Sequence, residues 1–417
     1  MTEETFGLEQ EALNLAAGAG HLLLENGAEI SRVEETMERI ANHYHSGKEH
    51  FFVLSNGIFI TGERYSNVEF IPLKGARMDI IVLVNQLSRQ IAQGRWTLEQ
   101  AKLRLSSIQS TPSKPLWEQL LGCSVGCAGF SAIFGGSLWD CAASLLAGTL
   151  MMVFVLLVGM PYLSKMLSNI LGGLMGTALC MLFHSFGLGD NLGNMIVGTL
   201  IPLIPGVPFT NGLRDLANED YLAGTTRLLD ALLVFFGIAL GVSVTFLAHS
   251  YVMGEMIQLH GTMTDSLTAT YMMQLLASFI GTAGFAVLFS VPRRYYLSTG
   301  CVGMAGWMVY LVSVRCAGMS VAVATFTATM VVTLLSYEFA RWKKCPSTVF
   351  LICGIFPMIP GAGVFWSTYY LVSAQMSQAL DAGFTAVKVT VAIVVAIVVV
   401  TNILHPSRFR ADAASKA

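Results

Sequence analysis

Two amphipathic patterns open the chain. In LEQEALNLAAGAGHLLLENG, apolar residues recur at helical spacing, and the run ends in a glycine, which commonly stops a helix. In AEISRVEETMERIANHY the spacing resumes, with Ile30, Val33, Met37 and Ile40 on one face and charged residues on the other. The pattern predicts two helices within residues 8–45.

The next pattern is typical of strands. In FFVLSNGIFITGE, two β-rich runs flank Ser55-Asn56-Gly57, which is a strong hairpin signal, and NVEFIPL adds a third strand. Helical spacing returns over residues 77–94 and 97–108, and TPSKP (111–115) reads as a linker. The predicted order α-α-β-β-β-α-α describes a small α+β domain with its own core.

From Trp117 onward the pattern changes to long apolar runs separated by short polar ones. Ten of these runs are long enough to span a membrane, at about 17–25 residues each. They cover approximately residues 118–137, 139–159, 165–187, 191–210, 226–248, 270–290, 296–314, 317–340, 347–372 and 384–404. Several contain glycines at spacings that let helices approach closely in lipid. We therefore expect an all-α transmembrane domain.

Charge agrees with this division. The chain has 417 residues, of which 12% are charged, and its mean hydropathy is +0.62. Half of the 50 Asp, Glu, Lys and Arg residues lie in residues 1–115. The net charge of −2 argues against nucleic acid as a partner. The polar N-terminus MTEETFGLEQ does not have the pattern of a signal peptide.

Lysine and arginine positions predict the orientation. If the N-terminal domain lies inside, the inner loops hold nearly all Lys and Arg residues of the membrane domain, which fits ten spans with both termini cytoplasmic in the cell (inner) membrane. The predicted divisions are a cytoplasmic domain with linker (1–115), a first five-helix repeat (116–250), an extracytoplasmic connection (251–268), a second five-helix repeat (269–406) and a cytoplasmic tail (407–417).

Two proline-glycine motifs interrupt the apolar runs. Pro202-Leu-Ile-Pro205-Gly206 and Pro357-Met-Ile-Pro360-Gly361 are 155 residues apart and fall in the fourth span of each set of five. Because five is odd, the second set enters the membrane from the opposite side, which predicts inverted repeats. Paired Pro/Gly breaks in matching spans point to the binding site of a transporter. A packing kink is the alternative interpretation of each break.

The physical argument is that proline and glycine free backbone amides and carbonyls, which must be buried in protein or line a wet cavity. We expect the two breaks to face each other across a hydrated chamber. The predicted substrate-binding residues are Pro202, Pro205, Gly206, Thr210, Asn211, Asp215, Pro357, Pro360, Gly361 and Ser367.

Three ionisable residues are candidates for proton coupling, each with an alternative. Asp215 could instead belong to a polar helix end at the interface. Asp230 could be a charge at a helix N-terminus near the headgroups, and Lys388 could extend its amine to the outer interface. The sequence predicts no metal site, because Cys123 and Cys127 have no further ligands nearby. It has no phosphate-binding GxxxxGK[ST] loop, so it is not an ATP-driven pump by itself.

The motifs LLLENGAEISRVEETMERIA, SNGIFIT and IPGVPFTNGLRD, followed by Gly224-Thr-Thr-Arg227, resemble the threonine/serine exporter family. The later motifs VPRRYYL and FPMIPGAGVFWSTYYLVSAQ resemble the family's small component, so the chain looks like a fused form. The matching motif positions are Gly27, Glu29, Arg32 and Glu34 in the cytoplasmic domain, and Pro205, Gly206, Asn211, Asp215, Arg227, Pro360 and Gly361 in the membrane domain.

The resemblance implies export of small polar metabolites driven by the proton motive force, with threonine and serine as substrates in some members of the family and dicarboxylates in others. Threonine and serine are the substrates that we expect first, and we expect no cofactor. The alternatives are export of dicarboxylates such as succinate, a membrane-anchored hydrolase that uses the cytoplasmic domain, and a passive channel. The expected partners are a small amino acid or dicarboxylate, protons and membrane lipid, and assembly into a homo-oligomer stays open. We do not expect an enzyme.

Overall fold

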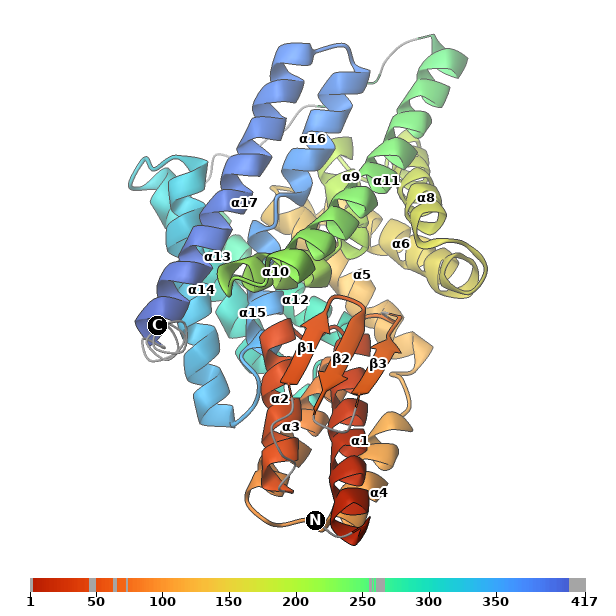
Figure 1. The fold of residues 1–417 in the computed structure, drawn as a ribbon. Coiled ribbons are helices and arrows are strands. Elements are labelled where there is room, and N and C mark those ends of the chain that lie inside the picture. Colours follow the sequence, from red (N-terminus) through yellow and green to blue (C-terminus); the bar gives the residue numbers. More distant parts are fainter. Residues whose placement is uncertain are drawn as a thin grey trace.

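The computed structural model describes residues 3–44, 50–62, 66–72, 74–254, 257, 259 and 267–404. Two parts are evident in Figure 1: the N-terminal domain, in red and orange, lies at one end, and the long helices from yellow to blue make up the rest. The predicted connection 251–268 falls largely outside the described residues, and the predicted tail 407–417 falls entirely outside them.

The N-terminal domain has the predicted order of elements. It consists of α1 (Glu3–Glu25), α2 (Ile30–His43), β1 (His50–Leu54), β2 (Gly57–Thr61), β3 (Ser66–Phe70), α3 (Met78–Ala92) and α4 (Leu98–Gln109). The three strands form an antiparallel sheet in the order β1-β2-β3, and Leu54 pairs with Gly57 across the predicted hairpin turn. Ile58 and Ile60 of β2 are buried in a core shared with α1 and α2. The prediction of a small α+β domain is thus confirmed.

The rest of the described chain is helical. Its first part consists of α5 (Leu116–Ile133), α6 (Leu138–Phe154), the π-helical η1 (Val155–Gly159), α7 (Met160–Tyr162), α8 (Lys165–Ser185), α9 (Leu192–Leu200), the 3₁₀ turn η2 (Ile201–Leu203), α10 (Gly206–Ala217) and α11 (Tyr221–Met253). Its second part consists of α12 (Leu267–Leu288), the 3₁₀ turn η3 (Arg293–Tyr295), α13 (Tyr296–Arg315), α14 (Val321–Lys343), α15 (Thr348–Ile355), the 3₁₀ turn η4 (Phe356–Met358), α16 (Gly361–Val372) and α17 (Met376–Leu404).

The prediction of ten spans is not confirmed in number. Within the described residues, eight helical segments are long and apolar enough to cross a membrane, or nine if the bent pair α9–α10 is one span. The predicted span 118–137 corresponds to the shorter α5, which ends at Ile133 and is not among them. The first turn of this helix contains Glu118 and Gln119, and three glycines follow, so α5 is less apolar than α6.

Helix contacts repeat between the two parts. The first helices of the two parts, α5 and α12, pack directly on each other. A side chain at Gly129 would collide with the backbone of Gly281, and one at Gly284 with the backbone of Gly122 and Gly126. Close approach of this kind needs glycine on both helices.

The matching helices α8 and α14 also bury matching faces. In α8 the buried residues are Ser168, Gly172, Gly173, Gly176, Thr177 and Cys180, and in α14 they are Ala324, Thr325, Ala328, Thr329, Val332, Thr333, Ser336 and Ala340. Each buried position of α8 has a buried counterpart 156 residues later. The half-helices after the breaks pack on the last long helix of the other part, α10 on α17 and α16 on α11.

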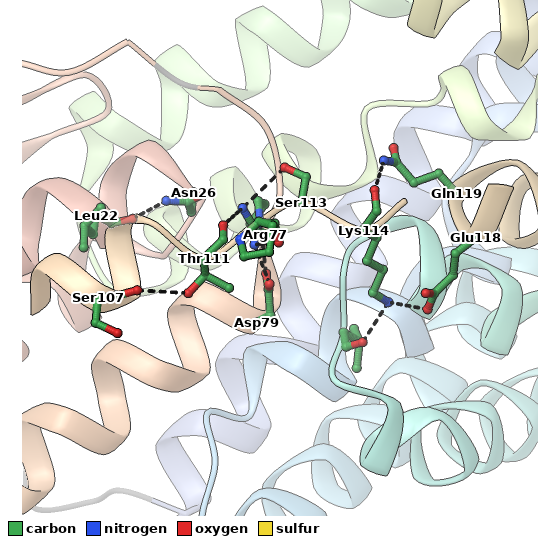
Figure 2. Close-up of polar contacts among 12 residues, drawn as sticks. Leu22, Asn26, Arg77, Asp79, Ser107, Thr111, Ser113, Lys114, Glu118 and Gln119 are labelled. Atoms are coloured by element: carbon green, nitrogen blue, oxygen red, sulfur yellow. Dashed lines mark hydrogen bonds and ion pairs between the residues drawn. The ribbon is translucent and has the colours of Figure 1, made fainter. Parts of the chain in front are cut away.

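The linker is held firmly between the domains. Arg77 donates to the carbonyl oxygen of Thr111 (3.0 Å) and pairs with Asp79, as Figure 2 shows. It also donates to the Pro112 carbonyl at 3.1 Å. Lys114 reaches the carboxylate of Glu118 on α5 (Figure 2). The backbone amide of Met78 donates to the Phe289 carbonyl at 3.1 Å, so α3 begins where α12 ends.

Candidate functional site

The first proline-glycine motif breaks its helix as predicted. After α9 the chain makes the 3₁₀ turn η2, Ile204 is extended (ψ 129°), and Pro205 (φ −77°, ψ 58°) precedes α10. The axes of the segments before and after the break differ by 66°. The Gly206 amide donates to the Ile204 carbonyl at 2.7 Å, which closes a tight turn around the proline.

The second motif has nearly the same backbone. After α15 the chain makes η4, Ile359 is extended (ψ 132°), and Pro360 (φ −74°, ψ 36°) precedes α16. The Gly361 amide donates to the Ile359 carbonyl at 2.7 Å. The two breaks are therefore copies of one local structure and not two unrelated kinks.

The breaks also contact each other reciprocally. A Cβ atom on Gly206 would collide with the Phe356 ring and lie 3.3 Å from Cδ1 of Ile359, while a Cβ atom on Gly361 would collide with Cδ1 of Ile204. Each glycine thus lies directly against side chains of the other break, Gly206 against Phe356 and Ile359, and Gly361 against Ile204. The expectation that the breaks face each other agrees with this packing.

The expected hydrated chamber between the breaks is not present among the residues that the structure describes. Ile204, Phe356 and Ile359 are buried and fill the space where the breaks meet. A cavity of about 30 Å³ lies beside them, and its lining is apolar apart from Thr368. A cavity of this size has room for a water molecule but not for a metabolite. The structure therefore has the breaks in a closed arrangement.

Polar residues gather instead just beyond the first break, where α10 meets the loop between α1 and α2. Arg214 of α10 forms an ion pair with Glu29, which also pairs with Arg32 at 2.8 Å. The residues Glu29 and Arg214 are 2% and 5% exposed, so this pair is shielded from water.

A second buried ion pair lies beside the first. Asp215 is fully buried, and its Oδ2 accepts a hydrogen bond from Nη1 of Arg227, on α11, at 2.6 Å. Its Oδ1 accepts the backbone amide of Ile30 at 3.2 Å. Both oxygens of this carboxylate therefore have partners, as a buried charge requires.

Two backbone carbonyls of the loop complete the contact. Nδ2 of Asn211 donates to the Gly27 carbonyl at 2.6 Å, and Nη2 of Arg227 donates to the Ala28 carbonyl at 2.8 Å. Gly27 has φ +83°, which favours glycine and explains the motif position. Motif residues that are far apart in the sequence thus form one network.

The second part of the membrane domain contributes hydroxyl groups. Thr348 donates to Glu29 at 3.1 Å and accepts from Arg214 at 3.0 Å. Arg214 also donates to Tyr337 and Ser347, each at 3.2 Å. The network therefore joins the N-terminal domain to α10, which follows the first break, and to α15, which precedes the second.

The pKa values of two motif carboxylates shift in opposite directions: Glu29, just before α2, and Glu34, within α2. Burial would raise the pKa of Glu29, but the guanidinium groups of Arg214 and Arg32 and the Thr348 hydroxyl outweigh it and hold the pKa below its ordinary value. Burial raises the pKa of Glu34 to about 7, against the hydrogen bond from the Val53 amide, which lowers it. The carboxylates of Asp220, Glu38 and Asp215 add negative charge and raise the pKa further.

The other predicted site residues lie elsewhere. Asp230 pairs with Lys165 on the exposed side of α11, and Lys388 is exposed on α17. Ser367 donates to the Ala379 carbonyl at 2.8 Å and so connects α16 to α17. Thr210 is fully buried on α10, next to Asn211.

Four residues of the network are absent from the predicted set. They are Arg214, Tyr337, Ser347 and Thr348. Arg214 is adjacent to Asp215 in the motif IPGVPFTNGLRD, so the sequence itself indicates a positive charge beside the predicted carboxylate. The three hydroxyl residues lie more than 120 positions further along the chain, and no local pattern marks them.

Comparisons with known proteins cover nearly the whole chain. A family model described as "Putative threonine/serine exporter" matches residues 14–248, and one described as "Threonine/Serine exporter, ThrE" matches residues 274–403. The chain is 23% identical over 317 residues to a "Probable threonine/serine exporter" of Mycobacterium tuberculosis, which is 73% of this chain and 59% of the relative.

It is 22% identical over 400 residues to a "Threonine/serine exporter" of Corynebacterium glutamicum, which is 91% of this chain and 79% of that relative. The chain thus spans less than two thirds of the length of the Mycobacterium relative. No solved structure matches the chain.

Proposed function

Because the chain belongs to the threonine/serine exporter family, we propose that it is a secondary exporter of small polar metabolites, with threonine and serine as its first candidate substrates. The predicted family is confirmed by this membership, and so is the prediction of a transporter in place of an enzyme. The chain is an integral membrane protein.

One observation carries the proposal of transport through the breaks. The two motifs have the same backbone, lie 155 residues apart and pack on each other through their glycines and isoleucines. Two half-helix pairs that meet at one place supply backbone groups that can be exposed when the halves move apart. The closed packing corresponds to one state of alternating access.

The repeated helix contacts support two five-helix units. The matched buried faces of α8 and α14, and the reciprocal packing of α10 on α17 and of α16 on α11, fit two units related by a pseudo-two-fold axis. In this proposal α5 and α12 are the first crossing of each unit, which makes ten. The Lys and Arg distribution supports both termini in the cytoplasm, beneath the inner membrane.

Proton coupling belongs to the same proposal. Of the three candidates, Asp215 is buried within a network that contacts both broken helices, whereas Asp230 and Lys388 lie on exposed helix faces. A carboxylate in that position can exchange a proton only when its partners move. We therefore place proton coupling at Asp215.

Transport by the purified chain in liposomes tests the proposal. Radiolabelled threonine, serine and succinate are loaded separately, and flux is measured with and without a pH gradient. We expect saturable flux of threonine and serine that increases with the gradient. Flux of succinate alone would favour the dicarboxylate alternative, and non-saturable flux independent of the gradient would favour a channel. Flux of none of the three would refute the exporter proposal.

A further inference from the structure

The loop between α1 and α2 presents the chemical groups of an amino acid to the membrane domain. We define this loop as residues Asn26–Ile30. Its Glu29 carboxylate pairs with Arg214, its Ile30 amide donates to Asp215, and its carbonyls accept from Asn211 and Arg227. A carboxylate and a nitrogen donor thus lie on two adjacent residues of α10.

Resting on the function proposed above, we propose that Arg214, Asp215 and Asn211, with the hydroxyls of Ser347 and Thr348, form a binding site for a zwitterionic hydroxy amino acid. In the present structure the loop occupies this site as a plug. Substrate and plug exclude each other, because they use the same groups.

The groups at the site match such a ligand one by one. A guanidinium is the preferred partner of a carboxylate, so the ligand's carboxylate takes the place of Glu29 on Arg214. The ligand's ammonium takes the place of the Ile30 amide on Asp215. Ser347 and Thr348, which already contact Arg214, are placed to bond a side-chain hydroxyl.

Two buried atoms beside the loop lack a partner within the described residues, which points to a ligand. Oδ1 of Asn211 and Oγ1 of Thr210 make no hydrogen bond there, although these residues are 1% and 0% exposed. Leaving such groups unpaired is costly, so a ligand that bonds them gains affinity. The loop satisfies only the Nδ2 half of the Asn211 amide.

The same geometry disfavours a dicarboxylate. Asp215 accepts a hydrogen bond from the loop, so its replacement must offer a donor there. Succinate has no nitrogen donor, and its second carboxylate would be repelled by Asp215. An amino acid offers an ammonium at that place.

Replacement of the plug by a ligand also explains how a buried network could open. Removing one member of a buried ion pair leaves an unpaired charge, which is strongly unfavourable. When a zwitterion takes over the bonds of the loop to Arg214 and Asp215 as the loop leaves, neither of these charges stays unpaired. The plug therefore opens readily only for a ligand with the matching groups.

Binding of threonine to the purified full chain is the first test. We expect Glu29→Gln to weaken the plug and lower the apparent Kd for threonine about fivefold, and Arg214→Gln to raise it at least about tenfold. Glu25→Gln is the matched control, because Glu25 pairs with Lys74 inside the cytoplasmic domain. We expect Glu25→Gln to leave the Kd unchanged, and an excess of succinate not to compete. The proposal would be overturned if Arg214→Gln bound threonine with wild-type affinity, or if Glu29→Gln and Glu25→Gln changed the Kd equally.

A cross-link gives a second test that needs no buried charge to be removed. Asn218 donates to Ser31 at 3.4 Å, next to the network. In Ser31→Cys/Asn218→Cys, oxidation should fix the start of α2 to the end of α10, reduce threonine flux at least about tenfold and be reversed by reductant. The controls are Ser31→Cys alone and Asn218→Cys alone, which carry the eight cysteines of the chain and one introduced cysteine. If the oxidised double variant transports like wild type, the plug is refuted; if wild type itself transports nothing, the exporter proposal fails instead.

Discussion

At the scale of single residues, Asp215 lies where the N-terminal domain meets α10 and α11. It is fully buried, and its two oxygens are shared between Arg227 and the Ile30 amide. Such a carboxylate holds two domains together and, by the proposal, meets the substrate as well. A change at this position is therefore expected to affect stability and transport together.

We predict that Asp215→Asn reduces threonine flux at least tenfold and destabilises the protein by about 3–5 kcal/mol, because Arg227 keeps a buried charge without its partner. The measurements are liposome flux and thermal unfolding in detergent. Asp230→Asn is the matched control, since its carboxylate pairs with Lys165 on an exposed face, and we expect little change there. Equal behaviour of the two variants would contradict the role given to Asp215.

Glu34 gives a pH dependence with a definite sign. Its pKa is raised from 4.5 to about 7, so the folded protein holds a proton on this group that the unfolded chain releases. Stability from this group is complete below about pH 4.5 and falls as the pH rises towards 7. We predict that Glu34→Gln raises the melting temperature at pH 8 by roughly 2 °C and flattens its decline between pH 5 and 7.

Glu99→Gln is the control for this measurement, because Glu99 is exposed on α4 of the same domain, where it pairs with Lys102. It should leave the slope of melting temperature against pH almost unchanged. A Glu34→Gln curve parallel to that of wild type would mean that Glu34 titrates normally.

At the scale of elements, the paired breaks were predictable and their packing was not. Proline and glycine positions alone place each interruption, because proline cannot continue a helix without loss of a hydrogen bond. The sequence does not say that Ile204 lies against Gly361 and Ile359 against Gly206, since these contacts join segments about 155 residues apart. The expected chamber was inferred from freed backbone groups, but apolar side chains fill that space in the closed arrangement.

The glycines of the breaks can be tested with a compensating pair. We predict that Gly361→Ala destabilises the protein by about 1–3 kcal/mol, because its methyl group collides with Cδ1 of Ile204. Ile204→Val removes that atom, so the double variant should recover most of the loss, which a double-mutant cycle in thermal unfolding measures. Gly363→Ala, with only a 3.3 Å contact to Ala386, is the control in the same helix. Absence of rescue would argue against direct contact of the breaks.

The number of spans shows where composition misleads. Hydrophobic runs gave good positions for the longer helices, whereas α5 fell short because it carries Glu118, Gln119 and glycines that face α12. Small residues lower the hydropathy of a helix but improve its packing in lipid. The prediction from apolar length counted this helix as the span 118–137, whereas its polar first turn and its glycines keep it out of the set of helices that are apolar enough to cross a membrane.

At the scale of the whole molecule, two groups of contacts among the described residues join the N-terminal domain to the membrane domain. One is the buried network at Glu29, and the other is the linker, which the sequence marked only as TPSKP. The two-domain division was predictable from charge density. The contacts between the domains were not predictable, because they depend on pairs such as Glu29 and Thr348, which are 319 residues apart.

Lys114 is the central residue of the second group of contacts. Its amine donates to the carbonyls of Val287 (3.2 Å) and Val291 (3.0 Å) at the end of α12, where free carbonyls and the helix dipole favour a cation. Burial lowers the pKa of Lys114, while Glu118 and Asp79 oppose that effect. The end of α12 and the Glu118 carboxylate both stabilise the charged form of this amine.

If this group of contacts couples the domains, its loss should loosen the linker without unfolding either domain. We predict that Lys114→Gln increases amide hydrogen exchange at least about tenfold over residues 111–115 and at the end of α12, while the core of α1 and α2 stays protected. Lys102→Gln, which removes only exposed pairs with Glu11 and Glu99, should leave exchange there unchanged. Equal exchange in wild type and Lys114→Gln would mean that Lys114 does not hold the linker and that other contacts, such as the network at Glu29, join the domains. In that case, by the proposal above, release of the plug would loosen the whole N-terminal domain, and substrate would control the position of the domain and not only that of its loop.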